Sequence, residues 1–366
     1  MGEIIILFIC IVVFDGIATI SNLIKGDKDV LYPDLIISTG LSLITSVILS
    51  LADNIIIAVL SLEGISVASD NPYPVLVCGL ALVVIGLLCK KNMREKVHVL
   101  NMYGLISRDI SDKKAIKELK LADYKVKEQV IDFIPFFNNG NINAGINRSI
   151  CNQIQTNVES FIAKTSDDIG CFTGMAPIPY TIYAGTFMEK GNVDRYFEYD
   201  GRDNEKKYYE LKKATRKQKK AGWSRLIEEF PTNINIDSEE VVLAISISHT
   251  IADEQLVQFN GKDVIKIKLE ETGDNIIQSI EQLQEYSKGI YECINVDIDK
   301  KYPSLKTIHL VASVPSCVSV NIGKNIGLRT NRNVDIIAYH FIRTANPTYK
   351  FGVFVNGSNK GQYIEG

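Results

Sequence analysis

The first ninety residues consist mostly of apolar runs, without the alternation of apolar and polar positions that a half-buried strand would show. The runs extend over Glu3–Ile24, Leu35–Ala52, Ile55–Ala68 and Pro74–Cys89. A helix over the first run would be about 33 Å long at about 1.5 Å per residue, enough to cross the hydrocarbon core of a bilayer. The pattern therefore predicts an α-helical transmembrane bundle over residues 1–91, with about four short spans. Three spans, with 55–68 re-entrant or interfacial, remain open because that run has only 14 residues.

Basic residues give the expected orientation of these spans. Of the 40 Lys and Arg in the chain, only Lys25 and Lys28 precede Cys89, and a cluster that begins at Lys90 follows the last run directly. Because Lys and Arg beside a span stay on the cytoplasmic side, we expect everything after Cys89 to be cytoplasmic. The alternative interpretation, buried helices of a soluble core, fits poorly, since a soluble domain seldom carries apolar runs of this length.

Two carboxyl groups, Asp15 and Glu63, lie inside the apolar runs. A carboxyl group at the middle of a bilayer costs roughly 2.5–3.5 kcal/mol on insertion scales, so each needs a polar surface or a proton. One hypothesis is a polar seam or pore lining that forms when several copies assemble. The other is a protonated or hydrogen-bonded carboxyl group at a helix interface, and the sequence leaves both open.

After this apolar quarter, the pattern changes to that of a water-soluble α/β protein. Residues 92–144 have the pattern of a connector, because Val97 to Ile134 combine Lys, Leu, Ile and Asp at loosely helical spacing. One helix is expected at about 146–164 and a basic helix at about 212–229, with short apolar runs alternating between them.

The second part of the soluble half contains the clearest strands. Five short runs are typical of buried strands, at Glu240–Ser248, Val264–Leu269, Thr307–Ala312, Val334–Ile342 and Tyr349–Val355. Asn275–Tyr291 is amphipathic, and an apolar helix is expected from Pro315 to Gly323. A β–α–β order with solid apolar strands predicts a Rossmann-like, mainly parallel sheet.

Two residue spacings recur along the soluble half and indicate a duplication. Pro177 and Gly185 are eight residues apart, and so are Pro315 and Gly323. Downstream of each pair, Tyr199 and Tyr209 are ten residues apart, and so are Tyr339 and Tyr349. Ligands of open α/β sheets bind at the carboxyl ends of the strands. A duplicated half-domain is therefore expected to form a shared cleft where the strand ends of both copies meet.

The chemistry-bearing residues argue against several classes of enzyme. None of the seven Cys forms a C-x-x-C pair, and the four His lie too far apart for a local zinc motif. The motifs G-x-S-x-G, H-E-x-x-H, G-x-x-x-x-G-K-[ST] and G-x-G-x-x-G are absent. Ser248 and His249 lie near Asp253, but consecutive residues of a strand point to opposite faces. We therefore expect no enzymatic activity, no catalytic residues, no metal and no cofactor.

Several segments of the second half resemble a known family. Ala312–Pro315, followed by Val318–Gly323 and Val334–Tyr339, resembles the C-terminal part of SAVED domains. Leu243–Ile251 resembles the first strand of the second half of that domain. The duplicated layout agrees, because SAVED domains resemble two fused CARF-like units.

This resemblance implies a domain layout for the soluble half. An α/β SAVED-like sensor would occupy residues 145–356, made of two fused CARF- or Rossmann-like halves at about 145–230 and 238–356. Residues 357–366 would form a short tail. Together with the expected transmembrane bundle, the chain is similar to a membrane-spanning SAVED effector of CBASS, the bacterial anti-phage systems that signal with cyclic oligonucleotides.

The resemblance also implies a function and a set of partners. The soluble domain would bind a cyclic di- or trinucleotide and no DNA or RNA polymer. Binding would drive SAVED domains to stack into a homo-oligomer, and the multi-pass spans would then disrupt the lipid bilayer of the bacterial inner membrane, causing abortive infection. Two alternatives stay open: a membrane-anchored enzyme, such as a hydrolase or a ring nuclease, and a ligand-free membrane scaffold.

A site for a cyclic oligonucleotide needs backbone N–H groups at helix starts, cationic side chains and aromatic platforms. The hydroxyl and imidazole candidates lie at the ends of predicted strands: Ser246, Ser248, His249, Thr250, Ser313 and Ser316. The cationic and aromatic candidates are Lys324, Arg329, Arg332, Lys190, Arg195 and Tyr180. Structural interpretations stay open, with Ser316 as a helix cap, the cations in solvated loops and Tyr180 in the core.

Overall fold

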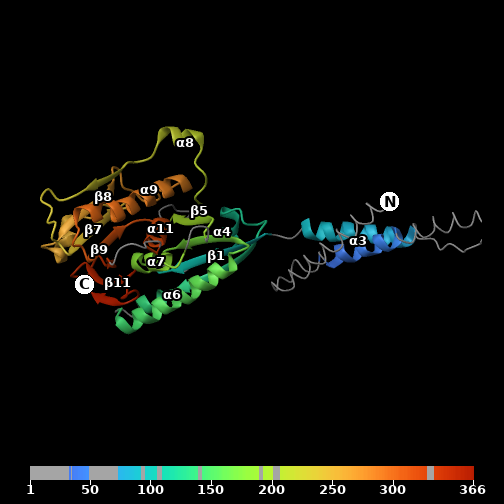
Figure 1. Cartoon of the computed structure of the whole chain (residues 1–366), viewed down its shortest axis with the longest axis horizontal. Coiled ribbons are helices and arrows are strands. Elements are labelled where there is room, and N and C mark those ends of the chain that lie inside the picture. The colour runs from blue at the N-terminus through green and yellow to red at the C-terminus, as the bar shows by residue number, and fades with distance from the viewer. Residues whose placement is uncertain are drawn as a thin grey trace, which may run out of the picture. The chain divides into compact units, whose positions relative to one another are not determined.

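In the computed structural model, the chain forms two compact units, Met1–Arg94 and Glu95–Gly366 (Figure 1). The structure describes residues 33, 35–48, 73–91, 95–104, 109–138, 142–188, 193–200, 207–327 and 334–366. The predicted membrane carboxylates Asp15 and Glu63 lie outside the described residues.

In the N-terminal unit, a helix at residues 35–48 packs against α3 (Tyr73–Lys91). Glycines allow the two backbones to approach closely, since a Cβ atom on Gly40 would lie 2.7 Å from the Gly79 carbonyl oxygen. Gly79 lies beside Ile44 and Gly86 beside Ile37, so the two helices run antiparallel. Other faces of α3 expose large apolar side chains, at Val77, Leu80, Val84, Ile85, Leu87 and Leu88.

The predicted bundle of about four transmembrane spans is wrong. Among the residues that the structure describes, no helix combines the length and the apolar character needed to cross a bilayer. The described part of the helix at 35–48 has 14 residues, and the apolar part of α3, Val75 to Cys89, has 15. At about 1.5 Å per residue these segments reach only about 21–23 Å, whereas a bilayer core is about 30 Å thick.

The C-terminal unit is a mixed α/β structure with two sheets, in agreement with the α/β part of the prediction. The five-stranded sheet has the order β2-β1-β3-β4-β5. Its strands are β1 (Lys96–Tyr103), β2 (Lys125–Asp132), β3 (Ile169–Gly174), β4 (Arg195–Asp200) and β5 (Lys207–Glu210). β1 pairs in parallel with β2 and β3, β3 pairs in parallel with β4, and β5 closes the edge in antiparallel orientation.

The seven-stranded sheet has the order β12-β11-β10-β9-β7-β8-β6. Its strands are β6 (Leu226–Glu229), β7 (Glu240–Ser246), β8 (Asp263–Leu269), β9 (Thr307–Ser313), β10 (Asp335–Phe341), β11 (Tyr349–Phe354) and β12 (Tyr363–Glu365). The four central strands β10, β9, β7 and β8 are parallel, while β6, β11 and β12 are antiparallel additions at the two edges.

Helices connect the strands in both sheets. They are α4 (Lys113–Glu118), α5 (Ile134–Asn138), α6 (Ala144–Lys164), α7 (Ile178–Gly185), α8 (Arg216–Ala221), α9 (Ile280–Glu292), α10 (Ile298–Lys301) and α11 (Ser316–Gly327). A 3₁₀ helix, η1 (Asp253–Phe259), and a π-helical turn, η2 (Cys293–Asp297), complete the set within the described residues. Figure 1 shows α6 along the five-stranded sheet and α9 along the seven-stranded one.

The two sheets repeat one arrangement. The order β2-β1-β3-β4-β5 of the first sheet corresponds to β8-β7-β9-β10-β11 of the second, with three parallel pairs followed by one antiparallel pair in each. The duplication inferred from the Pro177 and Pro315 spacings is therefore present, because each proline lies between a strand and the helix that follows it.

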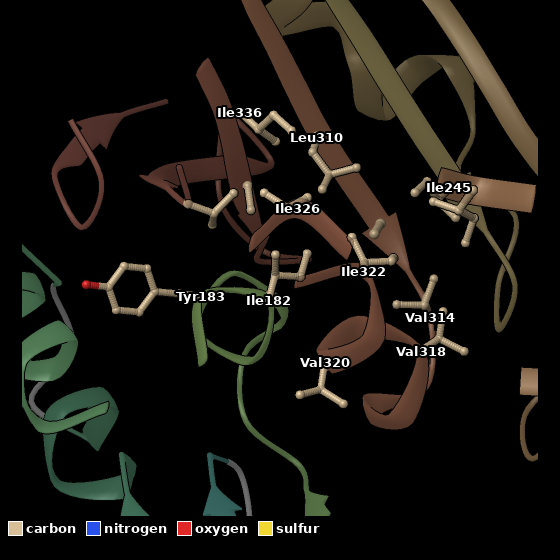
Figure 2. Close-up of a cluster of buried hydrophobic side chains, with 14 of the residues drawn as sticks. Ile182, Tyr183, Ile245, Leu310, Val314, Val318, Val320, Ile322, Ile326 and Ile336 are labelled. Atoms are coloured by element: carbon tan, nitrogen blue, oxygen red, sulfur yellow. The ribbon is translucent and has the colours of Figure 1, made fainter. Parts of the chain in front are cut away.

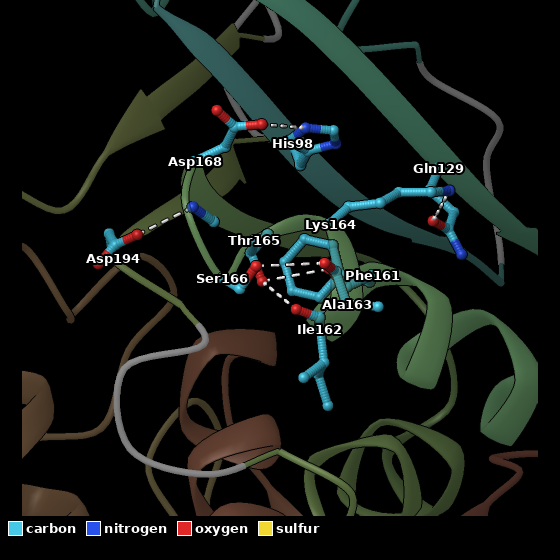
Figure 3. A network of polar contacts seen from close by, with 11 residues as sticks. His98, Gln129, Phe161, Ile162, Ala163, Lys164, Thr165, Ser166, Asp168 and Asp194 are labelled. Carbon is cyan, nitrogen blue, oxygen red and sulfur yellow. Dashed lines mark hydrogen bonds and ion pairs between the residues drawn. The ribbon is translucent and has the colours of Figure 1, made fainter. Parts of the chain in front are cut away.

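The repeated unit begins earlier in the chain than the sequence pattern indicated. The segment 92–144, predicted as a connector with helical spacing, supplies β1 and β2 to the five-stranded sheet. Figure 3 shows how polar contacts join this segment to α6 and to the turn before β3. His98 Nε2 lies 3.1 Å from Asp168 Oδ2, and Lys164 Nζ donates to Gln129 Oε1 at 3.1 Å. Most side chains of β2 are only partly buried or exposed, so its apolar alternation is weak.

The basic helix expected at about 212–229 is much shorter in the structure. Thr215 caps α8, and Gly222 ends it with φ of 70°, a conformation that favours glycine. The following residues form β6, which pairs antiparallel with β8 along the sheet edge.

The two halves meet at a crossing of α7 and α11. A Cβ atom on Gly185 would lie 2.9 Å from Gly323 Cα, and the same distance separates a Cβ atom on Gly323 from Gly185 Cα. Each helix also contacts the sheet of the other half, α7 at β10 and β11, and α11 at β3 and β4. Figure 2 shows the buried side chains around the crossing, among them Ile182, Val320 and Ile322. The two halves consequently share one apolar core.

Candidate functional site

Two cavities that share lining residues lie at the carboxyl ends of β3, β7 and β9. The larger one has a volume of about 760 Å³ and the smaller one about 350 Å³. Shared lining residues are Met175, Ala176, Ile178, Ser248, Asp274 and Val314. We call the two together the carboxyl-end cavity. Its lining comes from both halves of the unit, in agreement with the shared cleft that the sequence predicted.

The loop after β7 is held in place by the end of β9. The Ser313 carbonyl oxygen accepts hydrogen bonds from the N–H groups of Ile247 at 2.9 Å and Ser248 at 2.8 Å. The Ser313 hydroxyl oxygen accepts from His249 N–H at 3.1 Å. Ser246 acts in the same way, because its Oγ accepts from Ile251 N–H at 3.0 Å. Ser246 and Ser313 therefore position the loop that carries the other candidates.

Ser248, His249 and Thr250 line the cavity, as expected from their place after β7. His249 Nε2 lies 3.4 Å from Asp274 Oδ1, and its side chain is 73% exposed. Thr250 Oγ1 lies 3.4 Å from Thr272 Oγ1. Arg343, which follows β10, adds an exposed guanidinium to the same cavity. This side therefore offers hydroxyl, imidazole and guanidinium groups to a ligand.

The start of α11 is occupied by a carboxyl group of the protein itself. Glu198 Oε1 accepts a hydrogen bond from Cys317 N–H at 2.6 Å, and Ser316 Oγ lies 3.2 Å from the same oxygen. Ser316 Oγ also donates to the Gly174 carbonyl oxygen at 2.7 Å. Burial raises the pKa of Glu198, and the hydrogen bonds from Cys317 and Ser316 lower it by less. In this arrangement, Ser316 and the helix start bind Glu198 at the place where the sequence analysis expected a phosphate.

Three candidates lie away from the cavity and have structural partners. The guanidinium of Arg195 donates to Glu210 through Nε at 2.7 Å and Nη2 at 3.0 Å. Tyr180 is fully buried, and its hydroxyl donates to Asn147 Oδ1 at 3.1 Å. Lys324 is buried with Nζ 3.4 Å from Tyr196 Oη, and burial lowers the pKa of this lysine. Lys190, Arg329 and Arg332 lie outside the described residues.

The smaller part of the cavity contains residues that the sequence analysis missed. Glu198, Asp200, Asp274 and Asn275 line it. Asn275 has φ of 52°, and its buried Nδ2 has no hydrogen-bond partner within the part of the chain that the structure describes. The sequence contained a sign of Glu198, because this charged residue directly follows the aromatic residues Tyr196 and Phe197, which are buried in β4. The loop residues Asp274 and Asn275 had no pattern that could distinguish them from an ordinary turn.

The residues considered for a serine-type triad are not assembled. His249 pairs with Asp274, whereas Asp253 Oδ1 lies 2.5 Å from Lys266 Nζ. Within the described residues, no group of three or more His, Cys, Asp or Glu side chains is arranged to hold a metal ion.

The chain belongs to the SAVED family. The model of that family, described as "SMODS-associated and fused to various effectors sensor domain", matches residues 153–355, which is more than half of the chain. The match includes β3 to β11 and all the residues of the carboxyl-end cavity. The family assignment predicted from the sequence is therefore confirmed at the level of the SAVED domain.

Solved structures similar to this chain include a SAVED/CARF-domain containing receptor, Cap4 of Acinetobacter baumannii. Its complex with the cyclic trinucleotide 2'3'3'-cAAA has a TM-score of 0.44 and 13% sequence identity over 79% of this chain. The structure of this receptor alone has a TM-score of 0.43 and 12% sequence identity over 76% of this chain. Its complex with 3'3'3'-cAAA has a TM-score of 0.43 and 13% sequence identity over 79% of this chain. The chain spans about half the length of these structures, 54–55%. No curated protein gives a significant match.

Proposed function

We propose that this chain senses a cyclic oligonucleotide that binds in the carboxyl-end cavity. The observation that carries the proposal is the position of this cavity within a SAVED domain: it opens at the strand ends of both repeated halves. Open α/β folds bind ligands at this edge of the sheet. A volume of about 760 Å³ is in the range of small-molecule sites, about 300–1,000 Å³.

The charges of the cavity match the two parts of a nucleotide. His249 and Arg343 lie in the larger part, where their N–H groups can donate to a phosphate oxygen. Asp200 and Asn275 lie in the smaller part, and Asp274 lines both parts. Carboxylate and amide oxygens accept hydrogen bonds from the exocyclic amino groups of bases, so this part suits base edges rather than phosphates.

A thermal shift measurement on the full-length chain tests the ligand class. Cyclic di-, tri- and tetranucleotides are compared with linear oligonucleotides of the same composition. A ligand present at a hundredfold excess over its Kd stabilises the folded state by about 2.7 kcal/mol. Stabilisation by a cyclic compound and not by its linear counterpart supports the proposal. The absence of a shift with every cyclic compound would exclude this ligand class.

The proposed response to the ligand is homo-oligomerisation by stacking of SAVED domains, followed by disruption of the bacterial inner membrane by the N-terminal unit. The exposed apolar side chains of α3 support a role in association with lipid or with other copies, since large exposed apolar surfaces mark interaction sites. Light scattering with and without ligand measures the assembly. Release of dye from liposomes that contain the full-length chain measures the damage, and leakage that does not depend on ligand contradicts the coupling.

We further propose that the chain does not cleave its ligand. The separation of His249 from Asp253, each of which has another charged partner, supports this proposal. Chromatography of the ligand after prolonged incubation with the protein is the test. Recovery of intact ligand is expected, and the appearance of linear products would establish a ring nuclease instead.

A further inference from the structure

A second cavity, separate from the carboxyl-end cavity, lies between α6 and the turn that joins β11 to β12. Its volume is about 590 Å³. Its lining residues include Arg148, Cys151, Asn152, Tyr183, Lys360 and Gln362. None of them lines the carboxyl-end cavity. Two of the lining side chains are cationic and none carries a carboxyl group. We call this the α6 cavity.

Lys360 is held in the α6 cavity by a well-defined turn. Gly361 N–H donates to the Phe354 carbonyl oxygen at 2.7 Å, and Asn147 Nδ2 donates to the Gly361 carbonyl oxygen at 2.8 Å. Gly361 has φ of 84°, which glycine adopts without strain. The turn therefore fixes the backbone of Lys360 before any ligand arrives.

The ammonium group of Lys360 lies against aromatic rings instead of an acidic partner. Its Nζ is 3.6 Å from the centroid of the Phe187 ring and 5.6 Å from that of Tyr183. Figure 2 shows the Tyr183 ring pointing away from the apolar cluster around Ile182. In the part of the chain that the structure describes, no carboxylate lies within 4.0 Å of Lys360 Nζ, and burial lowers the pKa of this lysine to about 8.

A partly desolvated cation without a counter-ion is unfavourable, and an anion that binds beside it removes that cost. Arg148, one turn into α6, provides a second positive group that has no acidic partner among the described residues. The fork of N–H donors on a guanidinium matches the oxygens of a phosphate group. The amides of Asn152 and Gln362 can hydrogen-bond to the organic part of the same ligand.

We propose that the α6 cavity is a binding site for a small phosphate monoester, whose phosphate group lies between Lys360 and Arg148. This site is independent of the proposed cyclic-oligonucleotide site, and neither proposal depends on the other.

Titration calorimetry on the full-length chain, with AMP and with inorganic phosphate as probes, tests this site. Lys360→Gln and the exposed Arg148→Gln are each expected to raise the Kd of AMP about tenfold, because each removes one charged donor. Lys288→Gln removes an exposed lysine of α9 and is expected to leave the Kd unchanged. Equal binding of both probes assigns the affinity to the phosphate group alone, and tighter binding of AMP adds a contribution from the amides.

The pH dependence separates this site from nonspecific attraction. A phosphate monoester has its second pKa near 6, so AMP is a dianion throughout the range from about pH 7 to 9. Binding favours the charged form of Lys360, so the Kd should change little near pH 7, where AMP is already a dianion and the lysine is mostly charged. It should then rise above pH 8, towards about tenfold per pH unit. Lys360→Arg keeps its charge and should remove this dependence.

The other titratable groups of the α6 cavity stay in one protonation state over that range. They are Arg148, Cys151, Tyr183 and Tyr363, and burial raises the pKa of the thiol to about 12 and raises the pKa of both phenols. Glu159, which accepts from Gln155 Nε2 at 2.9 Å, does not line the cavity. A Kd that is unchanged in both Lys360→Gln and Arg148→Gln, or no binding of either probe at millimolar concentration, would overturn the proposal.

Discussion

Glu198 is a buried carboxyl group in a cavity proposed to bind an anion. It occupies the start of α11, where Cys317 N–H would otherwise be available to a phosphate. A carboxylate at this place repels a phosphate, whereas a protonated carboxyl group does not. Burial raises the pKa of Glu198 and so favours the neutral form. In either form Glu198 accepts the hydrogen bond from Cys317 N–H, so the start of α11 is not available to a phosphate.

The stability of the protein should depend on the protonation of Glu198. The pKa of Glu198 is higher in the folded state than the value of 4.5 expected in the unfolded state. The stabilisation by the neutral carboxyl group is therefore fully present below pH 4.5 and is lost as pH rises through the pKa of the folded state. Glu198→Gln keeps the acceptor oxygen and removes the titration, so wild type should lose stability relative to this variant as pH rises from 4.5. The slope is at most about 1.4 kcal/mol per pH unit.

Urea unfolding of both proteins from pH 4.5 to 8 measures this difference. Glu254→Gln, on an exposed part of η1, is the control and should follow wild type at every pH. A constant difference between wild type and Glu198→Gln over the whole range contradicts a raised pKa.

Arg343 should contribute directly to ligand affinity. A hydrogen bond to a charged group contributes about 1.5–3 kcal/mol, so Arg343→Gln should weaken binding of a cyclic oligonucleotide about 10- to 150-fold. Fluorescence anisotropy with labelled ligand is a suitable measurement. Arg216→Gln, on the exposed α8, is the control for a general loss of positive charge. Equal affinities in the two variants would show that Arg343 does not contact the ligand.

At the scale of elements, the crossing of α7 and α11 fixes the distance between the two halves. Adding a methyl group at Gly323 would place its carbon against the Ile182 carbonyl oxygen, which is backbone and cannot rotate away. Gly323→Ala should therefore destabilise the protein by about 1–3 kcal/mol or more. Gly273→Ala is the matched control, since nothing lies within 4 Å of its Cβ position. Similar urea midpoints for the two variants would contradict the close crossing.

The sequence predicted the positions of buried strands more accurately than those of partly exposed strands. β7 and β9 are apolar along nearly their whole length and were placed within a few residues. β2 has partly exposed side chains on both faces, so its sequence lacks the alternation of apolar and polar residues that identifies a strand. The segment was therefore interpreted as a connector. The membrane interpretation failed for another reason: apolar composition was treated as continuous helix length, which the described helices do not reach.

The candidate site was predictable only where it follows buried strands. Ser248, His249 and Thr250 were found because they come directly after β7, and the parallel sheet brings that end to the cavity. Arg195 and Lys324 were selected by charge alone. Their partners, Glu210 and Tyr196, are distant in sequence, and no local pattern shows such contacts. Arg343 lies in a loop after β10 without a distinguishing neighbour.

At the scale of the whole molecule, sensing and response are expected to lie in different units. All residues of the carboxyl-end cavity belong to Glu95–Gly366. A chain truncated to residues 95–366 should therefore bind a cyclic oligonucleotide with the Kd of the full-length chain. Calorimetry on both proteins measures this. A large loss of affinity in the truncated protein, if it is folded by circular dichroism, would assign part of the site to the N-terminal unit.

The reciprocal contact of Gly185 and Gly323 relates the two halves as the subunits of a symmetric dimer are related. Identical subunits must present identical side chains on both sides of their axis, so they suit ligands that have the same symmetry. Here the halves are parts of one polypeptide and have diverged. The position of Glu198 in β4 corresponds to Ala338 in β10, counted from the repeated residues Tyr199 and Tyr339. Each side of the axis can thus evolve separately, so a ligand bound between the halves does not need to share their symmetry.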